Sequence, residues 1–291
     1  MTAAVPAGGR SLGRHALGTL ARDPAAVAAA VLLGLITLAV LLGPLVSDYS
    51  YSEINPANAS APPSFADGHY FGTDDLGRDL YVRTLYGGRI SLLVGIVATL
   101  VSLLIGVAWG AIAGFVGGRT DHIMMRLVDI LYATPFMFFV ILLMVVFGRN
   151  IVLIFVAIGA INWLDMARIV RGQTLSLKRR EFVEAARVTG VPTLAIIRRH
   201  IVPNLLGVVA VYATLTVPQV ILVESFLSFL GLGVQEPMTS WGALVHQGAQ
   251  VMEIAPWALL FPAGFLALTL YCFNFLGDGL RDALDPRDRR R

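Results

Sequence analysis

The chain has 291 residues, of which 56% are hydrophobic and 14% are charged, and its formal net charge is +3. Soluble domains carry about 25% charged residues, so this composition excludes an ordinary soluble domain and indicates a protein built for the lipid bilayer. The small net charge gives no support for a nucleic-acid partner. Cys272 is the single cysteine, which excludes an internal disulfide, and no Cys/His cluster has zinc spacing.

Hydropathy predicts six membrane-spanning helices, because a span needs about 20 mostly apolar residues. Their approximate ranges are 25–46, 90–116, 127–147, 151–167, 205–227 and 256–276. The first apolar run exceeds the roughly 7–15 residues of a signal-peptide core, and no clear cleavage site follows it, so we expect it to be retained. The predicted fold class is an all-α membrane protein, a polytopic six-helix bundle.

The distribution of basic residues predicts the orientation of the chain. If the N-terminus is cytoplasmic, all but four of the 22 Lys and Arg residues lie in cytoplasmic segments. The four exceptions are Arg78, Arg83, Arg89 and Arg149. Because cytoplasmic loops of membrane proteins carry the excess of Lys and Arg, both termini are predicted to be cytoplasmic.

This topology divides the chain into segments with different expected roles. They are an N-terminal tail (1–24), a first transmembrane helix (25–46), an extracytoplasmic loop (47–89), a core with five spans (90–277) that contains a large cytoplasmic loop (168–204), and a C-terminal tail (278–291). A plain helix bundle needs no long loops, so function is expected to concentrate in them.

The extracytoplasmic loop has turn chemistry at 72–74 and 77–79, which predicts a small folded insertion. Its acidic residues Asp74, Asp75 and Asp79 do not have the spacing of a calcium-binding EF-hand loop. We therefore expect no metal site in this loop.

Several charged residues lie at membrane depth. Glu224 falls near the outer end of the fifth span, where it either lines the translocation path or makes a structural pair. Asp129 and Arg126 are three residues apart, as are Asp165 and Arg168, so each pair is predicted to interact along its own helix.

Small and helix-breaking residues predict how the spans pack. Gly106, Gly110 and Gly114 repeat every four residues, which gives one face of the second span a smooth surface for close helix contact. This contact is expected either within the chain or with a partner. Pro135 and Pro218 lie inside predicted spans and are expected to kink them.

The cytoplasmic loop is predicted to form two helices. The first covers 176–188 and ends at Gly190, and the second covers about 193–200 and leads to Pro203. The expected apolar stripe of the first helix consists of Phe182, Ala185, Ala186 and Val188. Such a helix either enters a groove on another protein or rests on anionic lipid.

Motifs of catalysis are missing from the sequence. It contains no Gly-x-x-x-x-Gly-Lys-Ser/Thr phosphate loop, no Gly-x-Ser-x-Gly and no His-Glu-x-x-His. The chain is therefore expected neither to bind ATP by itself nor to be an enzyme.

One motif points to a family. Glu184-Ala185-Ala186 is followed after three residues by Gly190 and after nine more by 200–203, His-Ile-Val-Pro. This resembles the EAA loop of ABC importer permeases. The resemblance implies that Glu184, Ala185, Ala186 and Gly190 dock on an ATPase subunit. His occupies the Ile position of the family pattern, which makes His200 a poor choice for a chemical role.

Further blocks narrow the resemblance to peptide and nickel importer permeases. The segment 69–79 is similar to the signature His-x-Leu-Gly-Thr-Asp-x-x-Gly-Arg-Asp, with Phe71 in place of Leu. Other matching blocks are 86–95, 224–235, 240–242 and 274–286. Together they cover roughly residues 25–286 and are most similar to the "C" permease of oligopeptide and dipeptide importers.

The resemblance implies a type I importer permease with both termini cytoplasmic, in a bacterial cell membrane. The implied partners are a second homologous permease, two ATPase domains, an extracytoplasmic substrate-binding protein and a peptide substrate. ATP and Mg would be bound by the ATPase partners, and this chain would hold no cofactor. The binding protein would meet the extracytoplasmic loop at Asp74, Asp75 and Asp79.

Other functions stay open at this point. One alternative is that the same kind of importer carries nickel or another small solute, because selectivity often lies in the separate binding protein. An ion-coupled secondary transporter would depend on buried carboxylates such as Glu224, although the large cytoplasmic loop argues against it. An intramembrane enzyme would need a nucleophile and base that the sequence does not offer.

Overall fold

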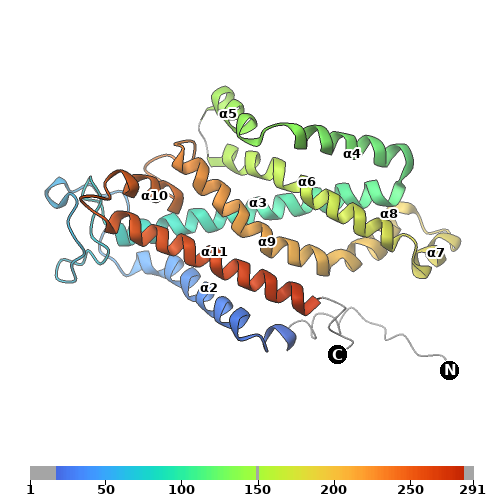
Figure 1. The fold of residues 1–291 in the computed structure, drawn as a ribbon, viewed down its shortest axis with the longest axis horizontal. Helices are drawn as coiled ribbons and strands as arrows, with labels where there is room; N and C mark the ends of the chain where they lie inside the picture. The colour runs from blue at the N-terminus through green and yellow to red at the C-terminus, as the bar shows by residue number, and fades with distance from the viewer. Residues whose placement is uncertain (1–17, 149–150, 285–291) are drawn as a thin grey trace.

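The computed structural model describes residues 18–148 and 151–284. Within these ranges the regular structure is helical (Figure 1), apart from isolated bridges, so the predicted all-α class is confirmed for the described part. The α-helices are α2 (Pro24–Leu42), α3 (Leu80–Val116), α4 (Gly118–Ala133), α5 (Phe136–Phe147), α6 (Ile151–Leu177), α7 (Glu181–Val188), α8 (Thr193–Ile196), α9 (Val202–Phe229), α10 (Trp241–Gln250) and α11 (Trp257–Leu284). Residues 1–17 and 285–291 of the predicted tails lie outside the described residues.

Four described helices are long and apolar enough to cross a membrane. They cover Pro24–Leu45, Leu80–Val116, Thr193–Phe229 and Trp257–Leu284. A fifth candidate is the bent pair formed by Gly118–Ala133 and Phe138–Phe147. The described part of the chain therefore gives four or five candidate spans, and the count of six stays a prediction.

The predicted third span is a broken helix. Its two halves, α4 and α5, meet at an angle of 86°. Thr134 and Pro135 both have extended backbone angles between them. Proline disfavours helical geometry in the residue before it and lacks the N–H that would continue the ladder. Pro135 thus ends one helix and starts another, which is a stronger effect than the expected kink.

α3 begins ten residues before the predicted second span. The Asp79 carboxylate accepts a hydrogen bond from the Val82 amide at 2.8 Å and caps the helix. This cap satisfies an amide that has no partner within the helix. The irregular segment before α3 therefore ends at Asp79, and the boundary between loop and membrane at Arg89 stays a prediction.

The long helices lie side by side in an elongated bundle (Figure 1). α3 packs along both α6 and α9, and α11 packs against α2, α9 and α10. Residues 43–79 and α10 lie at one end of the molecule, called here the α10 end. α7 lies at the opposite end, the α7 end. The two long loops predicted from the sequence thus occupy opposite ends of the bundle.

The three spaced glycines form the contact between α3 and α6. A Cβ on Gly110 would lie 2.4 Å from the carbonyl oxygen of Ala167, and one on Gly106 would lie 2.6 Å from the Met166 Cβ. A Cβ on Gly114 would lie 2.9 Å from the carbonyl oxygen of Arg171. These distances leave no room for a side chain, so the predicted packing role is confirmed and the partner is within the chain.

We expect Gly110→Ala to destabilise the folded protein by about 1–3 kcal/mol, because the added methyl group overpacks a backbone contact. Gly172→Ala is the matched control, since that glycine lies on α6 with nothing near its Cβ position. The control is expected to be neutral or stabilising by up to about 1 kcal/mol, through the lower chain entropy of alanine. Thermal unfolding midpoints in detergent measure both. Equal midpoints for the two variants would contradict the packing role.

Candidate functional site

The predicted docking helix is α7, at the α7 end (Figure 1). The single helix predicted over 176–188 is wrong, because α6 ends at Leu177 and α7 begins at Glu181. At the other end of α7, Gly190 has a φ of 77°. This left-handed conformation favours glycine and allows the chain to turn sharply into α8.

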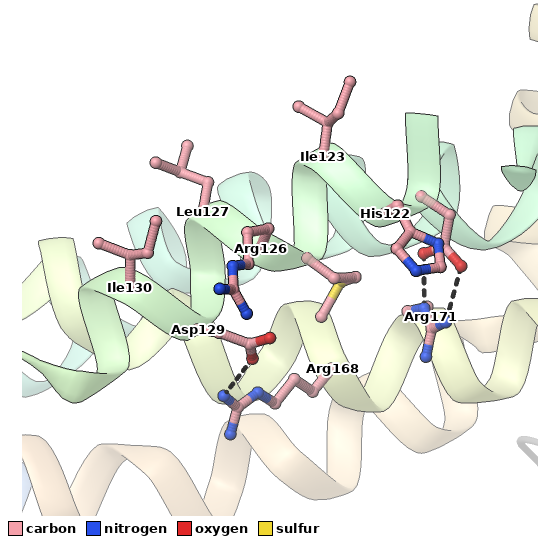
Figure 2. A pocket seen from close by; sticks show the side chains of 10 residues that line it. His122, Ile123, Arg126, Leu127, Asp129, Ile130, Arg168 and Arg171 are labelled. Carbon is pink, nitrogen blue, oxygen red and sulfur yellow. Dashed lines mark hydrogen bonds and ion pairs between the residues drawn. The ribbon is translucent and has the colours of Figure 1, made fainter. Parts of the chain in front are cut away.

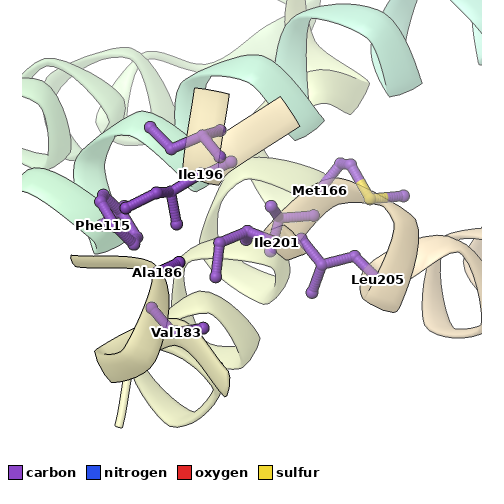
Figure 3. Close-up of a cluster of buried hydrophobic side chains, with 10 residues drawn as sticks. Phe115, Met166, Val183, Ala186, Ile196, Ile201 and Leu205 are labelled. Atoms are coloured by element: carbon purple, nitrogen blue, oxygen red, sulfur yellow. The ribbon is translucent and has the colours of Figure 1, made fainter. Parts of the chain in front are cut away.

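One side of α7 is packed into the bundle. Val183 and Ala186 are buried in an apolar cluster that includes Phe115, Ile196 and Ile201 (Figure 3). The cluster also takes in Ala111, Met166, Val170, Ile197 and Leu205, and so joins α3, α6, α7, α8, the π-helical turn Ile197–Ile201 and α9. We call this set of residues the α7 cluster. Residues three apart share one helix face, so a single short stripe attaches the helix.

The predicted apolar stripe of α7 is mostly exposed, so its contact with a partner or with lipid stays a prediction. Phe182 is 42% exposed and Val188 is 88% exposed, and only Ala186 of that stripe is buried. Val183, which the predicted stripe does not include, shares the buried face with Ala186 three residues later.

Two cations, one on α7 and one in the segment between α6 and α7, lie against the Phe115 ring at the end of α3. The Arg187 guanidinium carbon lies 4.8 Å from the centre of the Phe115 ring, and Lys178 Nζ lies 5.8 Å from it. Cations over an aromatic face are attracted by its negative potential. Burial, and secondly the charge of Arg187, lowers the pKa of Lys178.

The four residues of the docking motif separate into two groups. Glu184, Ala185 and Gly190 are exposed, whereas Ala186 is buried in the α7 cluster. The structure thus gives Ala186 an attaching role and leaves the other three available to a partner. Their contact with an ATPase subunit stays a prediction.

α4 is attached to α6 by ion pairs that cross between helices (Figure 2). Arg168 donates to Asp129 at 2.9 Å, and Arg171 makes two hydrogen bonds of 2.6 Å to Asp121. The pairs predicted within one helix, Asp129 with Arg126 and Asp165 with Arg168, are wrong. Helix periodicity gives pairs within one helix only, and the neighbouring helix α4 provides Arg168 with a closer carboxylate.

Glu224 is enclosed where α3, α9 and the start of α10 meet. Its side chain is fully buried and accepts hydrogen bonds from Ser228 at 2.7 Å and Ser91 at 3.4 Å. Ser91 in turn accepts the Trp241 amide at 3.1 Å. These contacts favour the structural alternative, while a role of Glu224 in the translocation path stays a prediction.

The α10 end is held by an ion cluster of three buried charged residues and one exposed carboxylate. Arg78 bonds Asp74 at 2.7 Å and Glu236 at 2.8 Å, and Arg83 lies 3.3 Å from Asp74. We call these four residues the loop ion cluster. It joins the 47–79 segment to the α9–α10 connection, more than 150 residues later in the sequence. Most Lys and Arg residues were predicted to be cytoplasmic, whereas Arg78 and Arg83 were predicted to lie outside. This exception was the only sequence signal that these two arginines have carboxylate partners.

The remaining acidic residue of the signature is also occupied. Asp79 accepts the cap bond of α3 and pairs with His69 Nδ1 at 2.8 Å. Asp74 and Asp79 are only 4% and 2% exposed, whereas Asp75 is exposed. The predicted surface contact of Asp74 and Asp79 with a binding protein is therefore corrected, because burial removes them from the surface. For Asp75 it stays a prediction.

Mutual pairing shifts the ionisation of the loop ion cluster. The Arg78 hydrogen bond lowers the pKa of Glu236, against an opposing effect of burial. For Arg78, burial works against the charge, but the hydrogen bonds and charges of Asp74 and Glu236 outweigh it and raise the pKa. Among the described residues, no group of three His, Cys, Asp or Glu side chains is suited to a metal ion.

We expect Asp74→Asn to destabilise the α10 end by about 3–5 kcal/mol, because two buried guanidinium groups lose their shared carboxylate. Asp75→Asn is the matched control one residue away, and its exposed side chain should leave stability unchanged. Protease cleavage within residues 47–79 and the unfolding midpoint report the difference. An unchanged midpoint in Asp74→Asn would contradict the structural role of the cluster.

Acid should weaken the same cluster in a defined direction. Because the pKa of Glu236 is lowered in the folded state, its stabilising contribution is present above the ordinary pKa of 4.5 and is lost as pH falls through the lower value. Glu236→Gln should therefore show a shallower loss of thermal midpoint below about pH 4.5 than the control Glu253→Gln. Parallel curves for the two variants would refute this assignment.

Comparison with known proteins gives consistent matches. Residues 106–290 match the family described as "Binding-protein-dependent transport system inner membrane component", and residues 11–63 match "N-terminal TM domain of oligopeptide transport permease C". The chain is 61% identical to the oligopeptide transport system permease protein OppC of Escherichia coli (strain K12), over 97% of this chain and 93% of the relative.

Two relatives from Bacillus subtilis (strain 168) are also similar. The oligopeptide transport system permease protein OppC is 49% identical over 96% of this chain and 91% of its own length. The dipeptide transport system permease protein DppC is 50% identical over 89% of this chain and 81% of its own length.

Proposed function

This chain belongs to the family of binding-protein-dependent transport system inner membrane components, and we propose that it is the permease subunit of an ATP-driven importer of oligopeptides. It is a multi-pass protein of the bacterial inner membrane. The relatives described above are named for oligopeptide and dipeptide transport, which supports a peptide substrate over nickel or another small solute.

The observation that carries the proposal is the attachment of α7. Val183 and Ala186 hold one face of the helix in the α7 cluster, while Glu184 and Ala185 on the other side are exposed. A short helix that is firmly attached and open on one face suits a groove on a partner protein. In the proposed importer that partner is an ATPase subunit.

Attachment through a shared cluster also suits force transmission. Because the α7 cluster includes residues of α3, α6 and α9, a displacement of α7 moves the ends of three long helices together. Closure of two ATPase domains would thereby shift the bundle between two states that open to opposite sides. ATP and Mg would bind to the partner chains, and this subunit would carry out no chemistry.

We further propose six spans with both termini in the cytoplasm. α6 has 27 residues, enough for a span of about 20 residues, and it packs along α3. With the bent α4–α5 pair, α2, α3, α9 and α11, it brings the number to six. The α7 end would then face the cytoplasm, where Lys and Arg concentrate.

The partners at the opposite end follow from this orientation. The α10 end would face the binding protein, and its exposed Asp75 is available for a complementary charge. A second, homologous permease would complete the path. The secondary-transporter alternative gains no support, because the carboxylate on which it would depend, Glu224, is enclosed by serines.

The test is co-purification of ATPase subunits with the detergent-solubilised protein. Glu184→Arg and Gly190→Trp should each reduce their recovery at least about tenfold, by placing a wrong charge or a large side chain in the contact. Quantitative mass spectrometry of the purified complexes measures the recovery.

Two matched controls lie at the α10 end. Glu253→Arg makes the same charge change on an exposed residue. Gly231→Trp places the same side chain at a glycine with a φ of 74° and nothing near its Cβ position. Both controls should retain the ATPase subunits. Recovery of the wild-type chain without ATPase subunits would reject the importer assignment. Equal recovery of ATPase subunits from all variants would reject the docking role of α7.

A further inference from the structure

A polar cavity lies between α3, α6 and α9, about halfway along these helices. Its volume is about 280 Å³. Polar side chains from all three helices line it, namely Ser102 from α3, Asn162 and Asp165 from α6, and Tyr212, Thr216 and Gln219 from α9. Ligand pockets occupy about 300–1,000 Å³, so this cavity fits part of an extended peptide and not the whole of one.

The unbalanced charge of this cavity is negative. Of the residues that line it, Asp165 and Arg168 are charged. The Arg168 guanidinium is engaged by Asp129 at 2.9 Å and lies 4.2 Å from the centre of the Tyr132 ring. Asp165 is exposed and has no ion-pair partner among residues 18–148 and 151–284. An ionised group within a helix bundle that lacks a partner of its own marks a solute path.

The neutral side chains present hydrogen-bond acceptors to the cavity. Ser102 and Thr216 donate their hydroxyl hydrogens to backbone carbonyls of their own helices, at 2.8 and 2.6 Å. Asn162 likewise donates its amide nitrogen to the Ile158 carbonyl at 2.9 Å. The single hydroxyl hydrogens of Ser102 and Thr216 and one of the two N–H groups of Asn162 are therefore engaged, and the side-chain oxygens of these three residues remain as acceptors. A group with several N–H donors and a positive charge complements such a surface.

We propose that this cavity is a subsite for the ammonium group of a peptide in transit, with Asp165 as its counter-charge. This inference rests on the proposed peptide transport and adds the residue that meets the substrate. An ammonium has three N–H donors and no acceptor, which matches a carboxylate surrounded by acceptors. Glu224, the candidate for the translocation path in the sequence analysis, is enclosed and lies outside this cavity.

The test compares uptake in cells that carry the complete importer with wild-type chain, Asp165→Asn or the control Glu253→Gln. The labelled probes are tri-alanine, N-acetyl-tri-alanine and N-acetyl-Ala-Lys-Ala. The binding protein is the same in all strains, so its own selectivity cancels when each variant is compared with wild type. Asp165→Asn should lower tri-alanine uptake about tenfold, as expected for loss of one charge-assisted contact, and leave N-acetyl-tri-alanine unchanged.

The third probe identifies the source of the ammonium group. If N-acetyl-Ala-Lys-Ala uptake falls as tri-alanine uptake does, the cavity accepts any ammonium; if it does not fall, the cavity reads the peptide N-terminus. Equal loss for all three probes would mean that Asp165 supports the fold, and no loss for any would mean that it meets no substrate. Either result overturns the inference.

A second measurement does not depend on peptide uptake. Gln219→Cys, in a Cys272→Ser background, places a reactive thiol at the cavity. The thiol is labelled with two methanethiosulfonate reagents, one of which carries a trimethylammonium group and the other a sulfonate group. The cationic reagent should react about tenfold faster, and Asp165→Asn should abolish this preference, because a negatively charged cavity concentrates cations. Equal rates in both backgrounds would overturn the inference. If cells with the wild-type chain take up no peptide but the cationic reagent still reacts faster, the proposed function fails and the cation-binding subsite stands.

Discussion

The close approach of α3 to α6 is the contact on which the rest of the structure depends. Gly106, Gly110 and Gly114 bring the two backbones together without intervening side chains. In a bilayer, where lipid tails are as apolar as leucine, such backbone contact is a main source of helix association. The contact fixes the end of α3, and with it Phe115, beside α7. It also sets the spacing at which α9 completes the polar cavity.

The two ends of the bundle are stabilised by different kinds of interaction, ion pairs at the α10 end and apolar contacts at the α7 end. The α10 end contains buried charges in which each arginine meets a carboxylate, an arrangement that tolerates little change because an unpaired buried charge is costly. The α7 end is held by an apolar cluster and by cations over one ring. Apolar side chains have no directional bonds, so they can keep contact while a helix shifts. In the proposed orientation, a rigid outer end and an adaptable cytoplasmic end fit a permease that is moved by ATPase partners.

Charged residues inside the bundle separate by whether they are paired. Arg168 and Arg171 join α4 to α6 through carboxylates, and Glu224 is surrounded by serine hydroxyls. These groups are satisfied by the fold itself. Asp165 lines a cavity and has no ion-pair partner among the described residues, so in our proposal the transported peptide supplies the opposite charge. Carboxylates in one helix bundle therefore have a structural role where the fold pairs them, and a proposed role in transport where it does not.

The sequence by itself determined the class of protein, the long helices and the docking motif. Long apolar runs, the glycine spacing and the EAA pattern are local features, and they were sufficient for the membrane class, the close helix contact and the family, while docking on an ATPase stays a prediction. Only the tertiary structure decided which charges meet. Asp129 pairs with Arg168 on another helix, Asp74 is covered by two arginines, and α7 buries Val183 and Ala186 against segments far away in the sequence. Such pairings depend on distances between segments far apart in the chain, and helix periodicity carries no information about those distances.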